Sequence, residues 1–159
     1  MTVALLGLCL LIGVVAGLRA LTPTAVVAWG AYIGWVNLTG LWSSWMASVI
    51  AVAIFSVLAV VELVTDQLPK TPSRKTPMQF GTRLITGAFA GAVLGSAFHH
   101  TFAGAGAGII GAVLGTLGGA EFRSRLVAAT GGKDLPIALL EDAIAVGGGF
   151  LTVYLMTTL

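Results

Sequence analysis

The stretch at residues 62–83, ELVTDQLPKTPSRKTPMQFGTR, decides the fold because it is the long polar segment that separates two sets of apolar runs. The chain has 159 residues but only eight basic and six acidic side chains. Outside this stretch, the charges fall at Arg19, within residues 121–134, and at Glu141 and Asp142. If the apolar runs between these four groups cross a membrane, all four groups lie on one side, which the positive-inside rule predicts to be the cytoplasm.

The composition also predicts a membrane protein. Charged residues make up 9% of the chain, against about 25% in soluble domains, and the mean hydropathy is +1.01. A soluble fold could not cover its surface with so few charges, so we expect membrane lipids as partners. The net charge of +2 gives no reason to expect a nucleic acid partner. Cys9 stands alone in an apolar run, so no disulfide, metal site or cofactor is predicted.

Six apolar segments predict an all-α fold, a polytopic membrane helical bundle of about six transmembrane segments in one integral membrane domain, residues 1–159. Thr22 is the expected N-cap of the second helix, with Pro23 at its first position. Six crossings of the inner (cytoplasmic) membrane place both termini outside the cytoplasm. The first two segments are short, so a broken or re-entrant pair around residues 21–23 stays open as an alternative. The predicted spans are residues 2–18, 23–36, 44–65, 83–98, 101–120 and 136–158, with a cytoplasmic loop at 66–82.

The aromatic residues fit this topology independently of the charges. Tryptophans gather around a turn at Asn37, on the predicted outer side, and other aromatic residues lie where further outer helix ends are expected. Such an interfacial belt is typical of membrane proteins. The residues concerned are Trp35, Trp42, Trp45, Phe98, Phe102 and Tyr154.

Glycines recur every four residues in the two segments of a predicted helical hairpin, where they predict close helix packing. Small residues let helices approach closely in lipid. We favour contacts within the chain, because a very short turn joins the two segments, while contacts between copies in a homo-oligomer stay open. The packing candidates are Gly87, Gly91, Gly95, Gly104, Gly108, Gly111, Gly115 and Gly119.

Charged residues at the cytoplasmic helix ends are the candidates for binding a substrate or an ion. Glu62 and Asp66 share one helix edge at a spacing of four residues, with Arg19 as the nearest expected partner. Glu62 is either a proton or cation site, or one half of a structural pair with Arg19. Glu141 and Asp142 diverge by about 100° on a helix, so we expect at most one to face the interior, where it would join Arg83 and the others in an acidic vestibule. A structural role at the helix N-terminus is open for both.

The 66–82 loop combines rigidity, positive charge and hydroxyl groups. Three prolines keep it extended, and its side chains form a candidate receptor for a phosphate or a lipid headgroup. A simple topological anchor is the favoured alternative, since any basic loop satisfies the positive-inside rule. The binding candidates are Lys70, Ser73, Arg74 and Lys75.

Two motifs also resemble a known family. Residues 17–23, GLRALTP, followed by AVVAW at residues 25–29, and residues 62–74, ELVTDQLPKTPSR, are similar to the bacterial membrane proteins grouped as domain of unknown function 4126. The glycine-rich hairpin extends the resemblance over most of the chain. It implies a small helical protein integral to the membrane and no particular activity. It marks Arg19, Glu62, Asp66, Pro69 and Arg74 for attention.

No set of residues predicts an enzyme. His99 and His100 are expected on the outer side, away from the acids, so no nucleophile, base and acid converge. The histidine pair could bind a metal or sense acid, but we favour a polar turn, because metal sites need three or four convergent ligands.

The sequence therefore predicts a small inner-membrane protein that binds or translocates a substrate through a charged cytoplasmic vestibule. The substrate would be a small cation, a proton-coupled solute or a lipid-type molecule. The alternative is a structural or assembly protein whose glycine faces pack copies or partner helices, without transport.

Overall fold

The computed structural model describes residues 1–68, 73 and 75–159, and the regular elements in these residues are all helices, without strands. The prediction of an all-α fold is confirmed. The elements are α1 (Thr2–Leu18), α2 (Thr22–Tyr32), η1 (Ser44–Ala47), α3 (Val49–Thr65), α4 (Pro77–Ser96), α5 (Thr101–Ala129), α6 (Asp134–Leu155) and η2 (Met156–Thr158), where η marks a short 3-10 helix.

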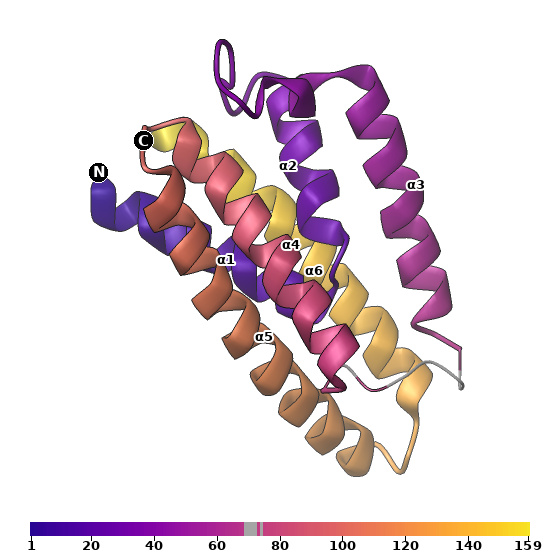
Figure 1. Cartoon of the computed structure of the whole chain (residues 1–159). Coiled ribbons are helices and arrows are strands. Elements are labelled where there is room, and N and C mark those ends of the chain that lie inside the picture. Colours follow the sequence, from indigo (N-terminus) through magenta and orange to yellow (C-terminus); the bar gives the residue numbers. More distant parts are fainter. Residues whose placement is uncertain (69–72, 74) are drawn as a thin grey trace.

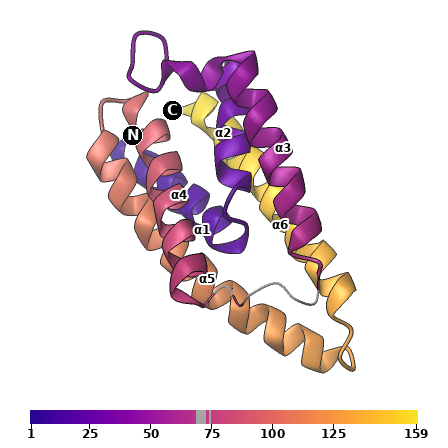
Figure 2. The same cartoon turned by 45° about the vertical axis from the view of Figure 1, so that its right-hand side comes forward.

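The helices run between two ends of the molecule. Both chain termini, the segment that joins α2 to α3 and the turn between α4 and α5 lie toward one end (Figure 1). The C-terminal end of α3, the start of α4 and the turn between α5 and α6 lie toward the other (Figures 1 and 2). Helices α1, α4 and α5 pack together, while α2 contacts both α3 and α6. The apolar core between them includes Leu5, Ile12, Val27, Leu94 and Val153.

Glycines make the closest helix contacts. A Cβ added to Gly91 would overlap the backbone of Gly104, and one added to Gly108 would overlap that of Gly87, so α4 and α5 meet with no side chain between them. Helix α1 lies against α5 in the same way, because Gly111 meets the backbone of Leu10. Gly115 contacts Val14, and Gly95 lies against His100 at the turn. These contacts are within the chain.

The first helix pair is short and broken. Helix α2 has 11 residues and ends at Tyr32, not at residue 36. At 1.5 Å per residue it is about 16 Å long, about half of a bilayer's hydrocarbon core. The expected N-cap is also wrong: Leu21 takes that place and Thr22 is the first helical residue. The predicted range 23–36 is therefore too long, and a bundle of six spans is not confirmed.

Other predicted boundaries shift for local reasons. The 44–65 segment breaks at Ser48, whose hydroxyl accepts a hydrogen bond from Ala51 N–H and caps α3. Helix α4 begins at Pro77, which suits a first helical turn, so residues 77–82 are helical and not loop. Helix α5 continues to Ala129, where an ion pair between Glu121 and Arg125 four residues apart supports the added turns.

Among the described helices, two are long and apolar enough to cross a membrane by length and composition. They are α5 and the stretch Asp134–Thr158, which is α6 with η2. Thr2–Leu18 and Val49–Thr65 are apolar but shorter.

Candidate functional site

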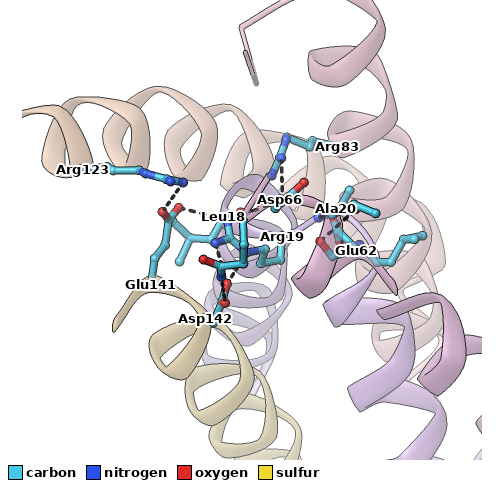
Figure 3. A network of polar contacts seen from close by, with 12 residues as sticks. Leu18, Arg19, Ala20, Glu62, Asp66, Arg83, Arg123, Glu141 and Asp142 are labelled. Atoms are coloured by element: carbon cyan, nitrogen blue, oxygen red, sulfur yellow. Dashed lines mark hydrogen bonds and ion pairs between the residues drawn. The ribbon is translucent and has the colours of Figure 1, made fainter. Parts of the chain in front are cut away.

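A buried arginine at the break between α1 and α2 organises the charged residues. Arg19 follows α1 with extended backbone, φ −141° and ψ 119°, and its side chain is 0% exposed. Its Nε and Nη2 each lie 2.5 Å from Asp142 Oδ1 (Figure 3). Its Nη1 lies 3.6 Å from Glu141 Oε1 and 3.7 Å from Asp66 Oδ2. One guanidinium thus joins α1 to α6 and to the end of α3.

Both adjacent carboxylates of α6 face this arginine. The expectation that at most one of Glu141 and Asp142 turns inward is wrong, because a planar guanidinium has several donor edges and two flexible side chains can reach different ones. Asp142 also accepts a hydrogen bond of 2.6 Å from Gln67 Nε2. Glu141 Oε2 lies 3.5 Å from Arg123 Nη1, which links α6 to α5.

Glu62 caps the broken helix pair. Its Oε1 accepts a hydrogen bond of 2.6 Å from Ala20 N–H, and its Oε2 one of 2.7 Å from Leu21 N–H. Helix α2 has no side-chain cap of its own, so this carboxylate from α3 accepts hydrogen bonds from the two amides that precede the helix and opposes the positive end of the helix dipole. One interpretation of Glu62 was a structural pair with Arg19. In the structure the partners of Glu62 are backbone amides, and Arg19 pairs with other carboxylates.

Arg83 satisfies the other side of the same break. Its guanidinium is 3% exposed, and Nη1 donates a hydrogen bond of 2.9 Å to the carbonyl of Gly17 near the end of α1. Its Nη2 lies 3.9 Å from Asp66 Oδ2. A cation from α4 thus meets the carbonyl end of α1, while an anion from α3 meets the amide end of α2.

A further ion pair, which the sequence did not predict, joins the C-terminal part of α5 to the start of α6. Arg123 forms a bidentate ion pair with Asp134, with N···O distances of 3.0 and 2.8 Å. A predicted helix end at residue 120 had placed both residues in a loop. The signal that could have found them is the turn at Gly131 and Gly132, both with positive φ, which folds the end of α5 back toward the start of α6.

Beside this network lies a cleft of about 750 Å³, here called the charged cleft. Among the described residues, three arginines and two aspartates line it, together with the polar side chains of Gln67, Ser73 and Ser124. Glu62 is not in this lining. The charged residues of the lining are Arg19, Arg83, Arg123, Asp66 and Asp134.

The remaining candidates lie apart from the charged cleft or outside the described residues. Lys75 is exposed, whereas Lys70, Arg74 and Pro69 fall outside the described residues. His99 lies in the α4–α5 turn with φ +62°, and His100 precedes α5. In the part of the chain that the structure describes, no group of three or more His, Cys, Asp or Glu side chains could hold a metal ion.

The comparisons with known proteins give one result. A family model with the description Domain of unknown function (DUF4126) matches residues 5–155. This range contains the whole charged network. Neither a curated protein nor a solved structure matches the chain.

Proposed function

The chain belongs to the domain of unknown function 4126 family, and we propose that it is a multi-pass membrane protein that binds a charged solute in the charged cleft, at the cytoplasmic side. The observation that carries this proposal is a roomy cleft whose wall includes a fully buried arginine. Burying a charge is costly, and ionisable groups at such places in membrane proteins mark binding sites more often than surface charges do.

Exposed apolar surface supports more membrane crossings than the two longest helices alone. Helix α3 exposes Ile50, Val57 and Val64 at 60% or more of their surface, although it is only 17 residues long. Helices α5 and α6 also expose large apolar side chains, among them Phe102 and Leu151. Such continuous apolar surface is stable in lipid but not in water. The charged network lies toward the helix ends, as the positive-inside rule requires.

The lining of the charged cleft favours a solute with groups of both signs over a bare cation. Arg19 is engaged by Asp142 behind the wall, which leaves Arg83 and Arg123 to face Asp66 and Asp134. Two cationic and two anionic groups suit a ligand that carries both an acidic and a basic group. Gln67 adds a polar, uncharged side chain to the wall.

Several polar groups farther from the charged end are already engaged, which supports binding or occluded transfer over an open pore. Ser96 donates to the carbonyl of Val93 and shares a hydrogen bond with Ser43. Thr152 donates to the carbonyl of Gly148, and Ser56 accepts from Trp29. Few polar side chains remain to carry water across the bundle.

A structural or assembly role is the second candidate, and α3 favours it. This helix packs mainly on α2, and most of its apolar side chains face outward. A second copy or a partner helix could cover that surface as well as lipid does.

Two measurements test the proposal. With Cys9 replaced by Ala, a cysteine at Ser124 should react with a membrane-impermeant maleimide only from the cytoplasmic side, and one at Asn37 only from the other side. Thermal unfolding is then followed with potassium ions, inorganic phosphate and phosphoethanolamine. A bound probe at 100 times its Kd stabilises by about 2.7 kcal/mol. We expect phosphoethanolamine to raise the Tm, and Ser124→Trp, which fills the cleft, to remove the shift. If no probe shifts the Tm, the assembly role is favoured.

A further inference from the structure

A second cavity adjoins the charged cleft and has the opposite character. It is a groove of about 300 Å³ between α1, α5 and α6, here called the apolar groove. Its walls are apolar side chains such as Leu114, Phe122 and Ile144, and the bare backbone of Gly118 and Gly119. Glu141 is the one charged residue among its described lining.

Neighbouring residues of the same chain segments line the two cavities. On α5, Phe122 lines the apolar groove and Arg123 lines the charged cleft. At the end of α1, Leu18 lines the apolar groove and the next residue, Arg19, lines the charged cleft. Arg123 lines the charged cleft and Glu141 lines the apolar groove, so their contact at 3.5 Å lies at the boundary between the two cavities.

We propose that the charged cleft and the apolar groove are the two halves of one site for a phospholipid whose headgroup carries a phosphate and a primary ammonium group. The phosphate lies beside Arg83 and Arg123, and the ammonium beside Asp66, Asp134 and Gln67. An acyl chain lies in the apolar groove. This inference rests on the proposed function and names the substrate class of the same cleft.

Charge complementarity selects this headgroup. The guanidinium of Arg123 contacts two carboxylates: Asp134, whose side chain is 60% exposed, and the buried Glu141 at 3.5 Å. A phosphate can take the place of the exposed Asp134 and leave the buried contact with Glu141 intact. The planar donor fork of arginine matches a phosphate. The freed carboxylate then accepts hydrogen bonds from the ammonium group. A headgroup with an anion alone would meet Asp66 and Asp134 without a cation of its own, and a quaternary ammonium cannot donate a hydrogen bond.

The apolar groove explains why a lipid fits better than a free solute. Its lining holds no polar side chain except Glu141 among the described residues, so a polar ligand gains nothing there. Gly118 leaves open space along the groove, since a Cβ built on it has no neighbour within 4 Å. A chain of methylene groups can lie along such a backbone surface in close contact.

The test uses native mass spectrometry of the purified full chain with equal amounts of dioleoyl phosphatidylethanolamine, phosphatidylglycerol and phosphatidylcholine. We expect the ethanolamine lipid to bind about tenfold better than the other two, the difference that one charge-assisted hydrogen bond makes. Asp134→Asn should abolish this preference or reverse it toward phosphatidylglycerol. Arg123→Gln should weaken all three lipids, whereas Arg125→Gln, which alters an exposed arginine paired with Glu121, should change nothing.

A glycine variant tests the apolar groove separately. Gly118→Leu should fill it and remove bound lipid, while the Tm shift with soluble phosphoethanolamine stays. Gly106→Leu, on the same helix and also without neighbours at its Cβ, is the matched control. Equal binding of the three lipids to the wild type, or lipid binding unchanged by both Gly118→Leu and Asp134→Asn, would overturn the inference. In that case a Tm shift with phosphoethanolamine would still support the proposed function, which fails only if no solute binds.

Discussion

The role of Glu62 as a cap for the broken helix pair leads to a measurable prediction for Glu62→Gln. The wild-type carboxylate accepts two backbone hydrogen bonds, 2.6 Å from Ala20 N and 2.7 Å from Leu21 N. The variant keeps one acceptor oxygen but points an NH₂ group at the second backbone N–H. It therefore loses one charge-assisted hydrogen bond, worth about 1.5–3 kcal/mol, and leaves an amide unsatisfied. We expect the variant to be about 2–3 kcal/mol less stable.

The assay is thermal unfolding of the protein in detergent, followed by circular dichroism. For a chain of this size a loss of about 2–3 kcal/mol corresponds to a fall in Tm of about 5–10 °C. Glu121→Gln is the matched control, because Glu121 pairs with Arg125 on the surface and its side chain is 58% exposed. Exposed pairs of this kind contribute about 0.3–0.5 kcal/mol.

Two results would refute the reasoning. If Glu62→Gln and Glu121→Gln unfold at the same temperature, the carboxylate does not hold the helix break together. If Glu62→Gln keeps the wild-type Tm but loses phosphoethanolamine binding, Glu62 takes part in ligand binding, contrary to its place outside the cleft lining.

Two further predictions concern the buried network and the glycine contacts. Arg19→Met should destabilise the fold by about 3–5 kcal/mol, because it leaves the largely buried Asp142 without its cation, whereas Glu141 keeps Arg123. Adding Asp142→Asn should recover part of the Tm, and a double variant no more stable than the single one would argue against this ion pair. Gly108→Ala should lower the Tm and the folded yield, because its Cβ would overlap the backbone of Gly87. Gly106→Ala has open space around its Cβ, so its free energy of unfolding should match that of the wild type or exceed it by up to about 1 kcal/mol. Equal Tm values for the two variants would show that α4 and α5 do not pack this closely.

Several features of the fold could be predicted from sequence because their causes are local. The range 2–18 for the first helix equals the bounds of α1, since an uninterrupted apolar run ends at a charged residue. The all-helical character and the family also follow from hydropathy and short motifs. The start of α4 was missed, although Pro77 carried a local signal for it, because the prediction gave more weight to the polarity of the loop.

Most partners of the charged residues could not be predicted, because they depend on where helices end in space. The sequence marked Arg19, Glu62 and Asp66 as a set, and Arg19 does lie 3.7 Å from Asp66. Its shortest contact, however, is to Asp142, 123 positions further along the chain, and Glu62 binds backbone amides. Backbone groups of a broken helix carry no sequence signal, so no pattern could name them as partners. Arg123 was missed because α5 runs nine residues beyond its predicted end.

Local chemistry along the chain thus determined which segments are helical and which end of the molecule collects the charges. Tertiary structure alone decided that a break between α1 and α2 lies against α3, α4 and α6, and that the charged cleft and the apolar groove meet at α5. The physical reason is that hydropathy and capping act over a few neighbouring residues. The pairing of buried charges and open backbone groups depends instead on the distances that helix packing sets between remote parts of the chain.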